Sequence, residues 1–299
     1  MNSNINYFNN ENINESYNNQ NNESFFTKIK NYFLNWYNNI TFSIKFIITI
    51  TFILFIFNFF IPLSYLLSNI TYYSIYKFQI WRFITGNFLM TNFINILFAI
   101  IFWINEAVQY EKQLSSTKYC IYFLINSTLI QILYSFLQFF FSLFYKNLIN
   151  NKKNDLENNG IWPYIIFEVS LMCILNPENN IYLLCIPYPI PSKYFPFILI
   201  LFLFILNMGI ELNLFVGFIY SFIYVYLIKN KMDFTNEKIE RMENSFLFNC
   251  VKDNTNFIKL NDVKNEILLT NKYNNNEYNE TTNNNFIPFS GTGIKLGGN

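Results

Sequence analysis

The sequence contains no histidine. This absence excludes Ser-His catalysis, the HExxH zinc site and any imidazole proton relay. The nucleophile elbow GxSxG, the phosphate loop GxxxxGK[ST] and the dinucleotide turn GxGxxG are missing as well. Charge is also scarce, since 13% of the residues are charged against roughly 25% in an average soluble domain. The composition therefore does not fit a soluble enzyme.

Cysteine is rare, and its spacing excludes two further classes of protein. The four cysteines are Cys120, Cys173, Cys185 and Cys250. They form no CxxC pair and have no histidine to share a metal with, so they indicate neither a disulfide framework nor a zinc site. We expect no metal and no cofactor, and we interpret the cysteines as packing residues.

Long apolar runs are what the sequence does contain, and they crowd into its middle. About 20 mainly apolar residues are needed for one helical crossing of a hydrocarbon core about 30 Å thick. The candidate spans are Phe46–Leu67, Phe88–Ile104, Tyr119–Tyr145, Ile161–Leu175 and two more between residues 181 and 229, broken near Met208 to Asn213. The sequence thus predicts an all-α, polytopic membrane protein with a bundle of about six transmembrane helices.

The two ends of the chain are rich in asparagine and differ from this middle. We predict a disordered tail over residues 1–29, a membrane domain over 30–228 and a flexible tail over 229–299. No secretory signal precedes the first span, which we expect to act as the insertion signal. Basic residues flank both ends of the membrane domain and place both termini in the cytosol. They are Lys28, Lys30, Lys45, Lys229, Lys231, Lys238 and Arg241. The bias is imperfect, because Lys146, Lys152 and Lys153 fall in a loop on the other side.

Carboxylates in or beside the spans are candidates for polar function inside the membrane. Glu106, Glu111 and Glu211 fall near predicted span ends, where we expect them to reach water. Glu168 lies inside the fourth span and stays a candidate for an intramembrane role.

A more specific signal is the stretch YKFQIWR, which ends at Arg82. Gln79, Trp81 and Arg82 stand just before the second span. An aromatic ring suits the membrane interface there, and a guanidinium can pair with phosphate or with backbone carbonyls. The run resembles the loop that opens the membrane domain of the Derlin family. The similarity extends over roughly residues 30 to 228: Asn95 is similar to an asparagine near the start of the second helix, and Gly217 with Ser221 stands where the family has GxxxG.

This resemblance implies a rhomboid-like bundle without catalysis. The related rhomboid proteases need a serine nucleophile and a histidine on the last helix, where this chain has Phe222. Derlins are multi-pass proteins of the endoplasmic reticulum membrane that help misfolded proteins leave for cytosolic degradation. The resemblance implies misfolded proteins, a ubiquitin-ligase complex and the lipid bilayer as partners, and no nucleic acid; it leaves homo- or hetero-oligomers open. It also implies that short helices, such as the fourth span, thin the local bilayer.

The last residues, FSGTGIKLGG, place large apolar side chains among glycines at the end of a polar tail. They resemble the short box with which several Derlins bind the valosin-containing AAA ATPase. An extended segment of this kind can add to a sheet edge while its apolar side chains fill pockets, and glycines allow close approach of the backbone. The matching positions are Phe289, Gly291, Gly293, Ile294, Leu296 and Gly297.

Three alternatives remain at this point. Derlin-like proteins also serve protein import across a secondary-plastid membrane, and the sequence does not exclude that address. Proline-containing, broken helices and Glu168 are also compatible with a transporter or channel. A structural adaptor that anchors the ATPase without moving a substrate is the third.

Overall fold

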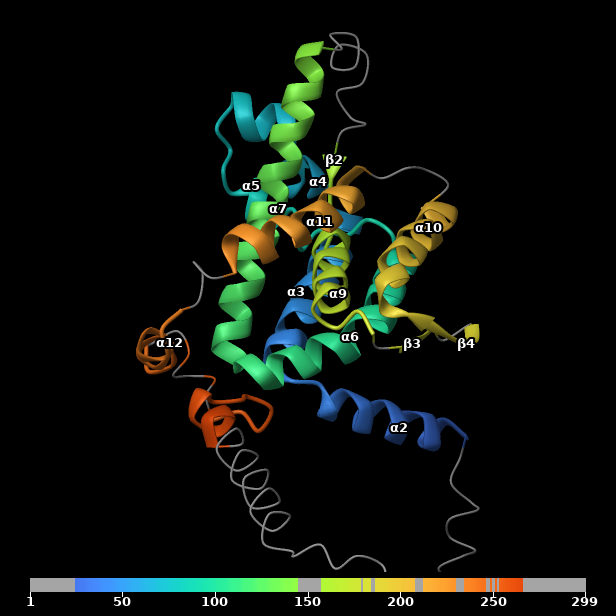
Figure 1. Ribbon diagram of the computed structural model, residues 1–299, viewed down its shortest axis with the longest axis vertical. Helices are drawn as coiled ribbons and strands as arrows, with labels where there is room; N and C mark the ends of the chain where they lie inside the picture. The colour runs from blue at the N-terminus through green and yellow to red at the C-terminus, as the bar shows by residue number, and fades with distance from the viewer. Residues whose placement is uncertain are drawn as a thin grey trace, which may run out of the picture.

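A computed structural model describes the chain from Phe25 to residue 265 with internal gaps (Figure 1). The described residues are 25–144, 157–178, 180–183, 186–207, 212–229, 234–245, 248, 251 and 253–265. The predicted break near Met208 to Asn213 falls mostly outside these residues, as do the glutamate Glu211 and most of the predicted N-terminal tail.

Six apolar helices make up the membrane domain in the described part of the chain. Three are long and apolar enough to cross a membrane: α3 (Phe42–Phe60), α6 (Phe93–Leu114) and α7 (Ser116–Phe144). Three are shorter: α9 (Trp162–Leu175), α10 (Phe195–Asn207) and α11 (Leu212–Ile223), which continues as the π-helical turn η3 (Tyr224–Ile228). The prediction of a polytopic all-α protein is confirmed.

The first two helices differ from their predicted limits. Helix α3 ends at Phe60, because Pro62 cannot donate the backbone hydrogen bond that a longer helix needs. The predicted span had continued to Leu67. Helix α6 starts at Phe93 rather than Phe88, since Asn92 caps it by accepting a hydrogen bond from the backbone nitrogen of Ile94 at 2.9 Å.

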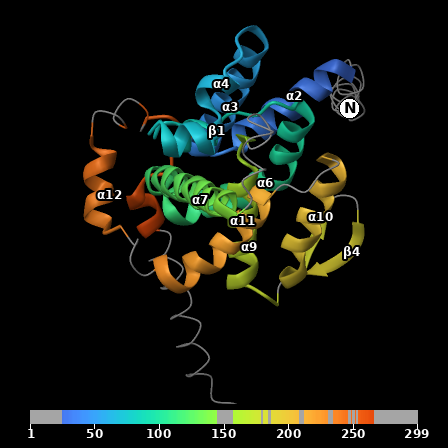
Figure 2. The same cartoon turned by 90° about the horizontal axis from the view of Figure 1, so that it is seen from above.

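Helix α9 stands at the centre of the bundle, with α6, α7, α10 and α11 around it (Figures 1 and 2). Eleven of its 14 residues are buried, which explains why its sequence is apolar on all sides. Helix α10 lies at the edge of the bundle beside the hairpin of β3 (Asn180–Leu183) and β4 (Ile186–Pro191), to which the 3-10 turn η2 (Ser192–Tyr194) links it.

The chain between α3 and α6 forms a loop of short elements. These are α4 (Ser64–Leu67), β1 (Asn69–Ile70), the π-helical turn η1 (Tyr72–Tyr76) and α5 (Arg82–Thr85). Strand β1 pairs antiparallel with β2 (Glu157–Asn158), which joins the loop to the segment before α9. We call residues 61–92 the first loop.

Both described ends of the chain meet at the other end of the bundle. Helix α2 (Phe25–Asn39) precedes α3 there, and the backbone nitrogen of Phe42 donates a 3.0 Å hydrogen bond to the carbonyl of Asn256. Helix α12 (Asn236–Glu243) and residues 253–265 are folded beside α7. This part of the predicted flexible tail is therefore structured, and a helix begins within the predicted N-terminal tail.

Candidate functional site: polar nodes and an apolar pocket

Arg82 holds the first loop together from inside. Its side chain is 3% exposed, and a buried charged group is costly unless its donors find partners. Its guanidinium donates to the carbonyl oxygens of Ser68 at 2.7 Å and Tyr65 at 2.5 Å, and its Nε donates to Oε1 of Gln79 at 2.6 Å. The guanidinium also lies 5.0 Å from the centre of the Tyr73 ring. Arg82 and Gln79 thus brace the backbone of the loop rather than face phosphate groups.

A second set of polar side chains joins this loop to helix α7. Asn69 Nδ2 donates to Oε1 of Gln131 at 2.7 Å and to Oγ of Ser135 at 3.0 Å. Gln131 Nε2 donates to Oδ1 of Asn87 at 3.1 Å, and all four residues are buried. The network satisfies these buried polar groups within the protein, as a loop packed against spanning helices requires.

Gly86 allows the close approach of the two parts of the loop. A Cβ at this position would come within 2.9 Å of the carbonyl oxygen of Arg82 and 3.1 Å of the backbone nitrogen of Asn69. The carbonyl of Gly86 also accepts a 2.8 Å hydrogen bond from the nitrogen of Gly160, just before α9.

Glu168 lies in the middle of the bundle on α9 and has no exposed surface. Its Oε2 accepts a 2.5 Å hydrogen bond from the indole nitrogen of Trp103 on α6. Both carboxylate oxygens are also within 3.2–3.3 Å of the Tyr119 hydroxyl, which donates from α7. The carboxylate therefore ties three helices together.

Glu111 was expected to reach water, and that prediction is wrong. Its carboxylate is fully buried at the start of α3. It accepts from the hydroxyls of Thr41 and Ser116, both at 2.5 Å, and from the backbone nitrogens of Ser43 at 3.0 Å and Ile44 at 3.3 Å. A helix N-terminus has free N–H groups and a partial positive charge, so a neighbouring helix supplies the cap that α3 lacks in its own sequence.

The small residues of the last helix lie against α9. A Cβ on Gly217 would overlap the carbonyl oxygen of Pro163 and come within 3.0 Å of its carbonyl carbon. Ser221 is fully buried, and its hydroxyl donates at 2.6 Å to the carbonyl of Phe218 in the same helix. Backbone contact of this kind is a main source of packing energy between helices in lipid. Phe222, on the same helix, is 39% exposed.

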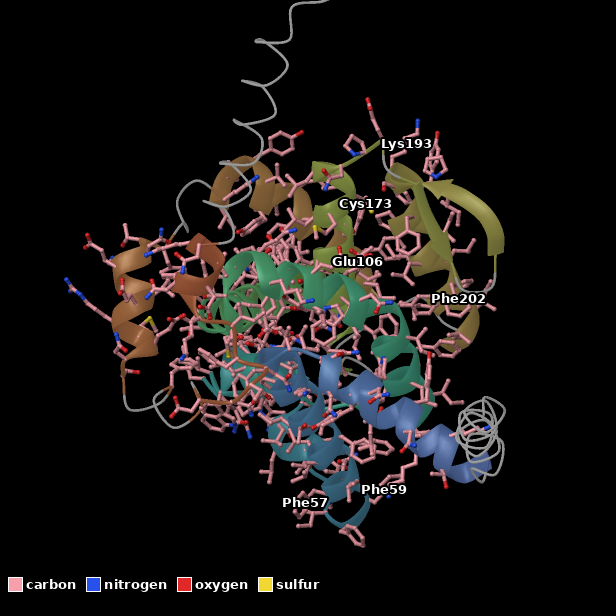
Figure 3. All side chains as sticks on the ribbon, turned by 90° about the horizontal axis from the view of Figure 1, so that it is seen from below. Phe57, Phe59, Glu106, Cys173, Lys193 and Phe202 are labelled. Carbon is pink, nitrogen blue, oxygen red and sulfur yellow. The ribbon has the colours of Figure 1, made fainter. Side chains whose placement is uncertain are left out.

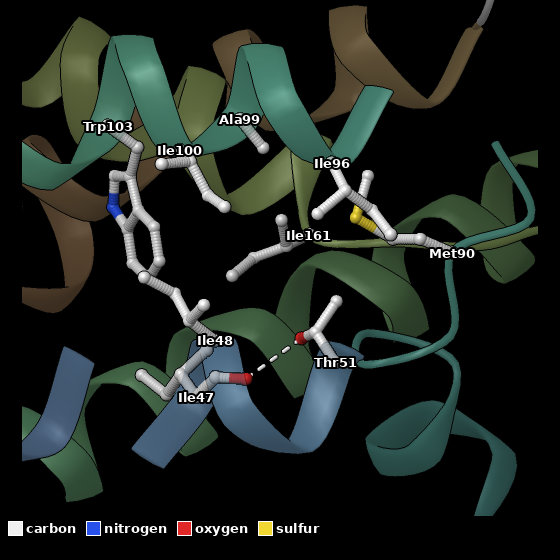
Figure 4. Close-up of a pocket in the computed structure, with 9 residues that line it drawn as sticks. All are labelled: Ile47, Ile48, Thr51, Met90, Ile96, Ala99, Ile100, Trp103 and Ile161. Carbon is white, nitrogen blue, oxygen red and sulfur yellow. Dashed lines mark hydrogen bonds between the residues drawn. The ribbon is translucent and has the colours of Figure 1, made fainter. Parts of the chain in front are cut away.

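An apolar pocket lies between α3 and α6 (Figure 4). It holds about 270 Å³ of empty space, including any that is continuous with the surroundings. Thr51 is the only lining residue with a hydroxyl, and this hydroxyl is used in a 2.9 Å hydrogen bond to the carbonyl of Ile47. The pocket therefore offers no polar group to a solute. Its lining residues are Ile47, Ile48, Thr51, Met90, Ile96, Ala99, Ile100, Trp103 and Ile161.

The remaining predicted residues are dispersed. Trp81 is 53% exposed on the first loop, and Asn95 is half-buried on α6. Glu106 is half-buried on the same helix. The predicted ATPase-binding residues, from Phe289 to Gly297, lie outside the described part of the chain.

Sequence reasoning missed the network on α7, although the sequence carried a signal for it. Asn126, Gln131 and Ser135 interrupt an otherwise apolar span, and a polar side chain inside a membrane helix needs a partner there. Asn126 also accepts a 2.8 Å hydrogen bond from the Tyr220 hydroxyl of α11. The partners come from segments far away in the sequence, so the pattern alone did not identify them.

The outer surface of the bundle is apolar and aromatic. Phe57 and Phe59 on α3 point away from the central helices (Figure 3), and they are 52% and 74% exposed. Such exposure of large apolar groups fits lipid and not water. Among the described residues, no group of three or more Cys, Asp or Glu side chains is placed to hold a metal ion.

Apolar spanning helices, an apolar exterior and internally satisfied polar groups together define a polytopic helical membrane protein. A family model described as eukaryotic integral membrane protein (DUF1751) matches residues 45–251. The match covers more than two thirds of the chain, and the chain belongs to this family. Among curated proteins, no match was found.

Proposed function

We propose that this chain is a non-catalytic, Derlin-like protein of the endoplasmic reticulum membrane that binds apolar segments of misfolded proteins and helps to move them out of the bilayer. The valosin-containing AAA ATPase, held by the C-terminal box, supplies the pulling force in this proposal. The resemblance of YKFQIWR and FSGTGIKLGG to Derlin sequences supports the assignment, and the lack of histidine supports the absence of rhomboid-type proteolysis.

The observation that carries the proposal is the position of helix α10. Its described part has 13 residues and is about 20 Å long, against a hydrocarbon core of about 30 Å. Helix α7 has 29 residues and is about 43 Å long. The fourth span, α9, is short as predicted but is enclosed by protein, whereas α10 lies at the edge and exposes Phe197, Leu201 and Ile205 by 55–65%.

A short helix at the edge favours a thinner bilayer on that side of the molecule, because a hydrophobic mismatch is relieved by thinning at a modest cost per Å. Thinner lipid lowers the cost of holding a polar or misfolded segment near α10. The long α7 imposes no such thinning on its own side. We therefore place client binding along α10.

Site-specific photocrosslinking in microsomes tests this proposal. A photoreactive amino acid at Leu201 or Ile205 of α10 is expected to crosslink to a misfolded membrane protein. At Phe140 or Phe141 of α7, which are 50% and 56% exposed, it is expected to crosslink to lipid alone. Equal crosslinking at both faces, or none at α10, would overturn client binding at this helix.

Two further measurements separate the parts of the proposal. A pull-down with the organism's valosin-containing ATPase, comparing the intact tail with a Phe289→Ala, Leu296→Ala double variant, tests the box, and binding is expected to be lost in the variant. Microscopy with markers for the endoplasmic reticulum and for other membranes tests the address. Residence in a plastid-surrounding membrane would favour an import role. Residence in any membrane other than these two would contradict the degradation role, and the crosslinking experiment would still test client binding.

A further inference from the structure

Helix α2 crosses the end of the bundle instead of joining it. In Figure 1 it runs across the direction of α7 and α9, and in Figure 2 its N-terminal half extends beyond the bundle. The joint with α3 is fixed by three contacts. Ile40 is 3% exposed in the core, Trp36 packs partly against the core, and the Lys45 ammonium lies 4.7 Å from the centre of the Tyr37 ring.

The sequence of α2 is amphipathic, and its apolar positions share the side of the helix that contacts the bundle. At 3.6 residues per turn, the apolar sequence positions Phe25, Ile29 and Phe33 share one side of the helix with Trp36. Trp36 packs partly against the core, so this side of the helix faces the bundle at its C-terminal half. The exterior of the neighbouring helix α3 is apolar, so we expect lipid beside the N-terminal half of α2.

The charges of α2 complement an anionic surface. Lys28 and Lys30 are exposed and fall on opposite edges of the apolar side, where a lysine can bury its stem and keep its ammonium at the headgroups. No Asp or Glu occurs from Phe25 to Lys45. A basic amphipathic helix without acidic residues is typical of a segment that lies in the membrane interface.

We propose that α2 lies in the interface of the leaflet at this end of the bundle and binds anionic phospholipid headgroups through Lys28 and Lys30. The helix would then set the depth of the bundle in the bilayer and gather anionic lipid beside α3. This inference does not depend on client binding or on the ATPase.

The test uses the full-length protein in nanodiscs of phosphatidylcholine, with and without phosphatidylserine. An environment-sensitive fluorescent amino acid replaces Ile29 or Phe33 on the apolar side, or Asn31 or Asn35 on the opposite side, one position at a time. Brominated lipid is expected to quench the first pair and iodide the second. If brominated lipid quenches neither pair, α2 is covered by protein or lies in water, and the proposal fails; quenching that occurs only in nanodiscs with a single copy would show that a second copy covers the helix instead.

Headgroup preference is measured by energy transfer from position 33 to labelled phosphatidylserine. The Lys28→Gln, Lys30→Gln double variant is expected to lose about fivefold in apparent preference for each lysine removed. The Lys28→Arg, Lys30→Arg variant keeps both charges and should retain the preference. An unchanged preference in the glutamine variant would overturn headgroup binding by these residues. Detergent-solubilised size-exclusion profiles that match the unmodified protein show that each variant is folded.

Discussion

The indole of Trp103 donates a 2.5 Å hydrogen bond to Oε2 of Glu168, and this bond joins α6 to α9 in the centre of the membrane domain. The Tyr119 hydroxyl reaches the same carboxylate from α7. An acidic residue inside a span is a functional candidate by default, but here its donors come from packed helices and its surface is closed. The geometry favours a role in helix assembly over a role in transport.

Replacing Glu168 is therefore expected to destabilise the bundle. In Glu168→Ala, Trp103 and Tyr119 lose their acceptor, and each unsatisfied donor costs about 1–3 kcal/mol. Glu168→Gln keeps one acceptor oxygen and should lose less. Thermal unfolding in detergent measures both variants. If Glu168→Ala unfolds like the unmodified protein while ion or solute flux in liposomes disappears, the transporter interpretation would replace this one.

Glu111 is expected to hold the two ends of the chain together as well as to cap α3. Ser116, one of its partners, accepts at Oγ a 2.9 Å hydrogen bond from the backbone nitrogen of Ile258. Glu111→Ala leaves the donors of Thr41, Ser43 and Ser116 without their acceptor. We expect the free energy of unfolding to fall by about 2–4 kcal/mol and amide exchange to become faster across residues 254–258. Hydrogen exchange with mass spectrometry measures the second effect. Glu106→Gln, five positions earlier on the same helix, is the control and should leave exchange unchanged.

The contact between α11 and α9 leaves no room for a methyl group. Gly217→Ala would drive a Cβ into the carbonyl oxygen of Pro163, and backbone cannot yield as a flexible side chain can. We expect a loss of about 2–3 kcal/mol or failure of the two helices to pack. Ser221→Ala removes a hydroxyl that bonds only within its own helix, so it should cost less than about 1 kcal/mol. Equal unfolding temperatures for the two variants would contradict this packing.

Hydropathy alone predicted the helices, because each span must satisfy its backbone internally and must be apolar outside. An apolar run also located α9, whose limits differ from the prediction by one residue. The ends of α3 and α6 were less accurate, since a proline and a capping asparagine override apolarity. Residues 229–299 were predicted to be a flexible tail because their composition is polar. The described parts that fold, α12 and residues 253–265, depend on partners such as Ser116 that are distant in sequence.

The polar sites were harder to predict than the helices. Arg82 was expected at the interface with phosphate or backbone carbonyls as partners; the structure shows the carbonyls of Tyr65 and Ser68, which no local pattern identifies. Glu111 was assigned to water because it falls near a span end; the free N–H groups of α3 attract it instead. In both cases the partners lie on loop and helix ends that only the fold brings to these side chains.

Arg82 is expected to resist replacement by lysine. Its planar guanidinium donates in three directions at once, and an ammonium on a lysine stem does not reproduce that geometry. Arg82→Lys should lose at least one charged hydrogen bond, each worth about 1.5–3 kcal/mol, and should open the first loop to limited proteolysis. Trp81→Ala is the matched control. The Trp81 side chain is 53% exposed, and its removal leaves the hydrogen bonds of Arg82 to Gln79, Ser68 and Tyr65 in place. Faster cleavage in the Trp81 variant than in the Arg82 variant would disprove the bracing role.

Glu243 gives the folded C-terminal segment a dependence on pH. Partial burial on α12, outside the membrane spans, raises the pKa of this carboxyl above its ordinary value of 4.5, although a 3.2 Å hydrogen bond from the backbone nitrogen of Leu260 opposes the shift. When the C-terminal segment is detached, the carboxyl is not buried and its pKa is lower than in the docked form. Protonation of Glu243 therefore favours the docked form. Docking is therefore strongest at acidic pH and weakens as the pH rises through the pKa of the docked carboxyl.

Amide exchange of residues 258–263, corrected for its intrinsic pH dependence, is expected to become faster as the pH rises above about 4.5. Glu243→Gln keeps an acceptor for Leu260 but cannot ionise, so its protection should stay constant over the same range. Glu237→Gln, at an exposed position of the same helix, should behave like the unmodified protein. If the pH dependence persists in Glu243→Gln, another group controls docking, because no other charge change accompanies that substitution.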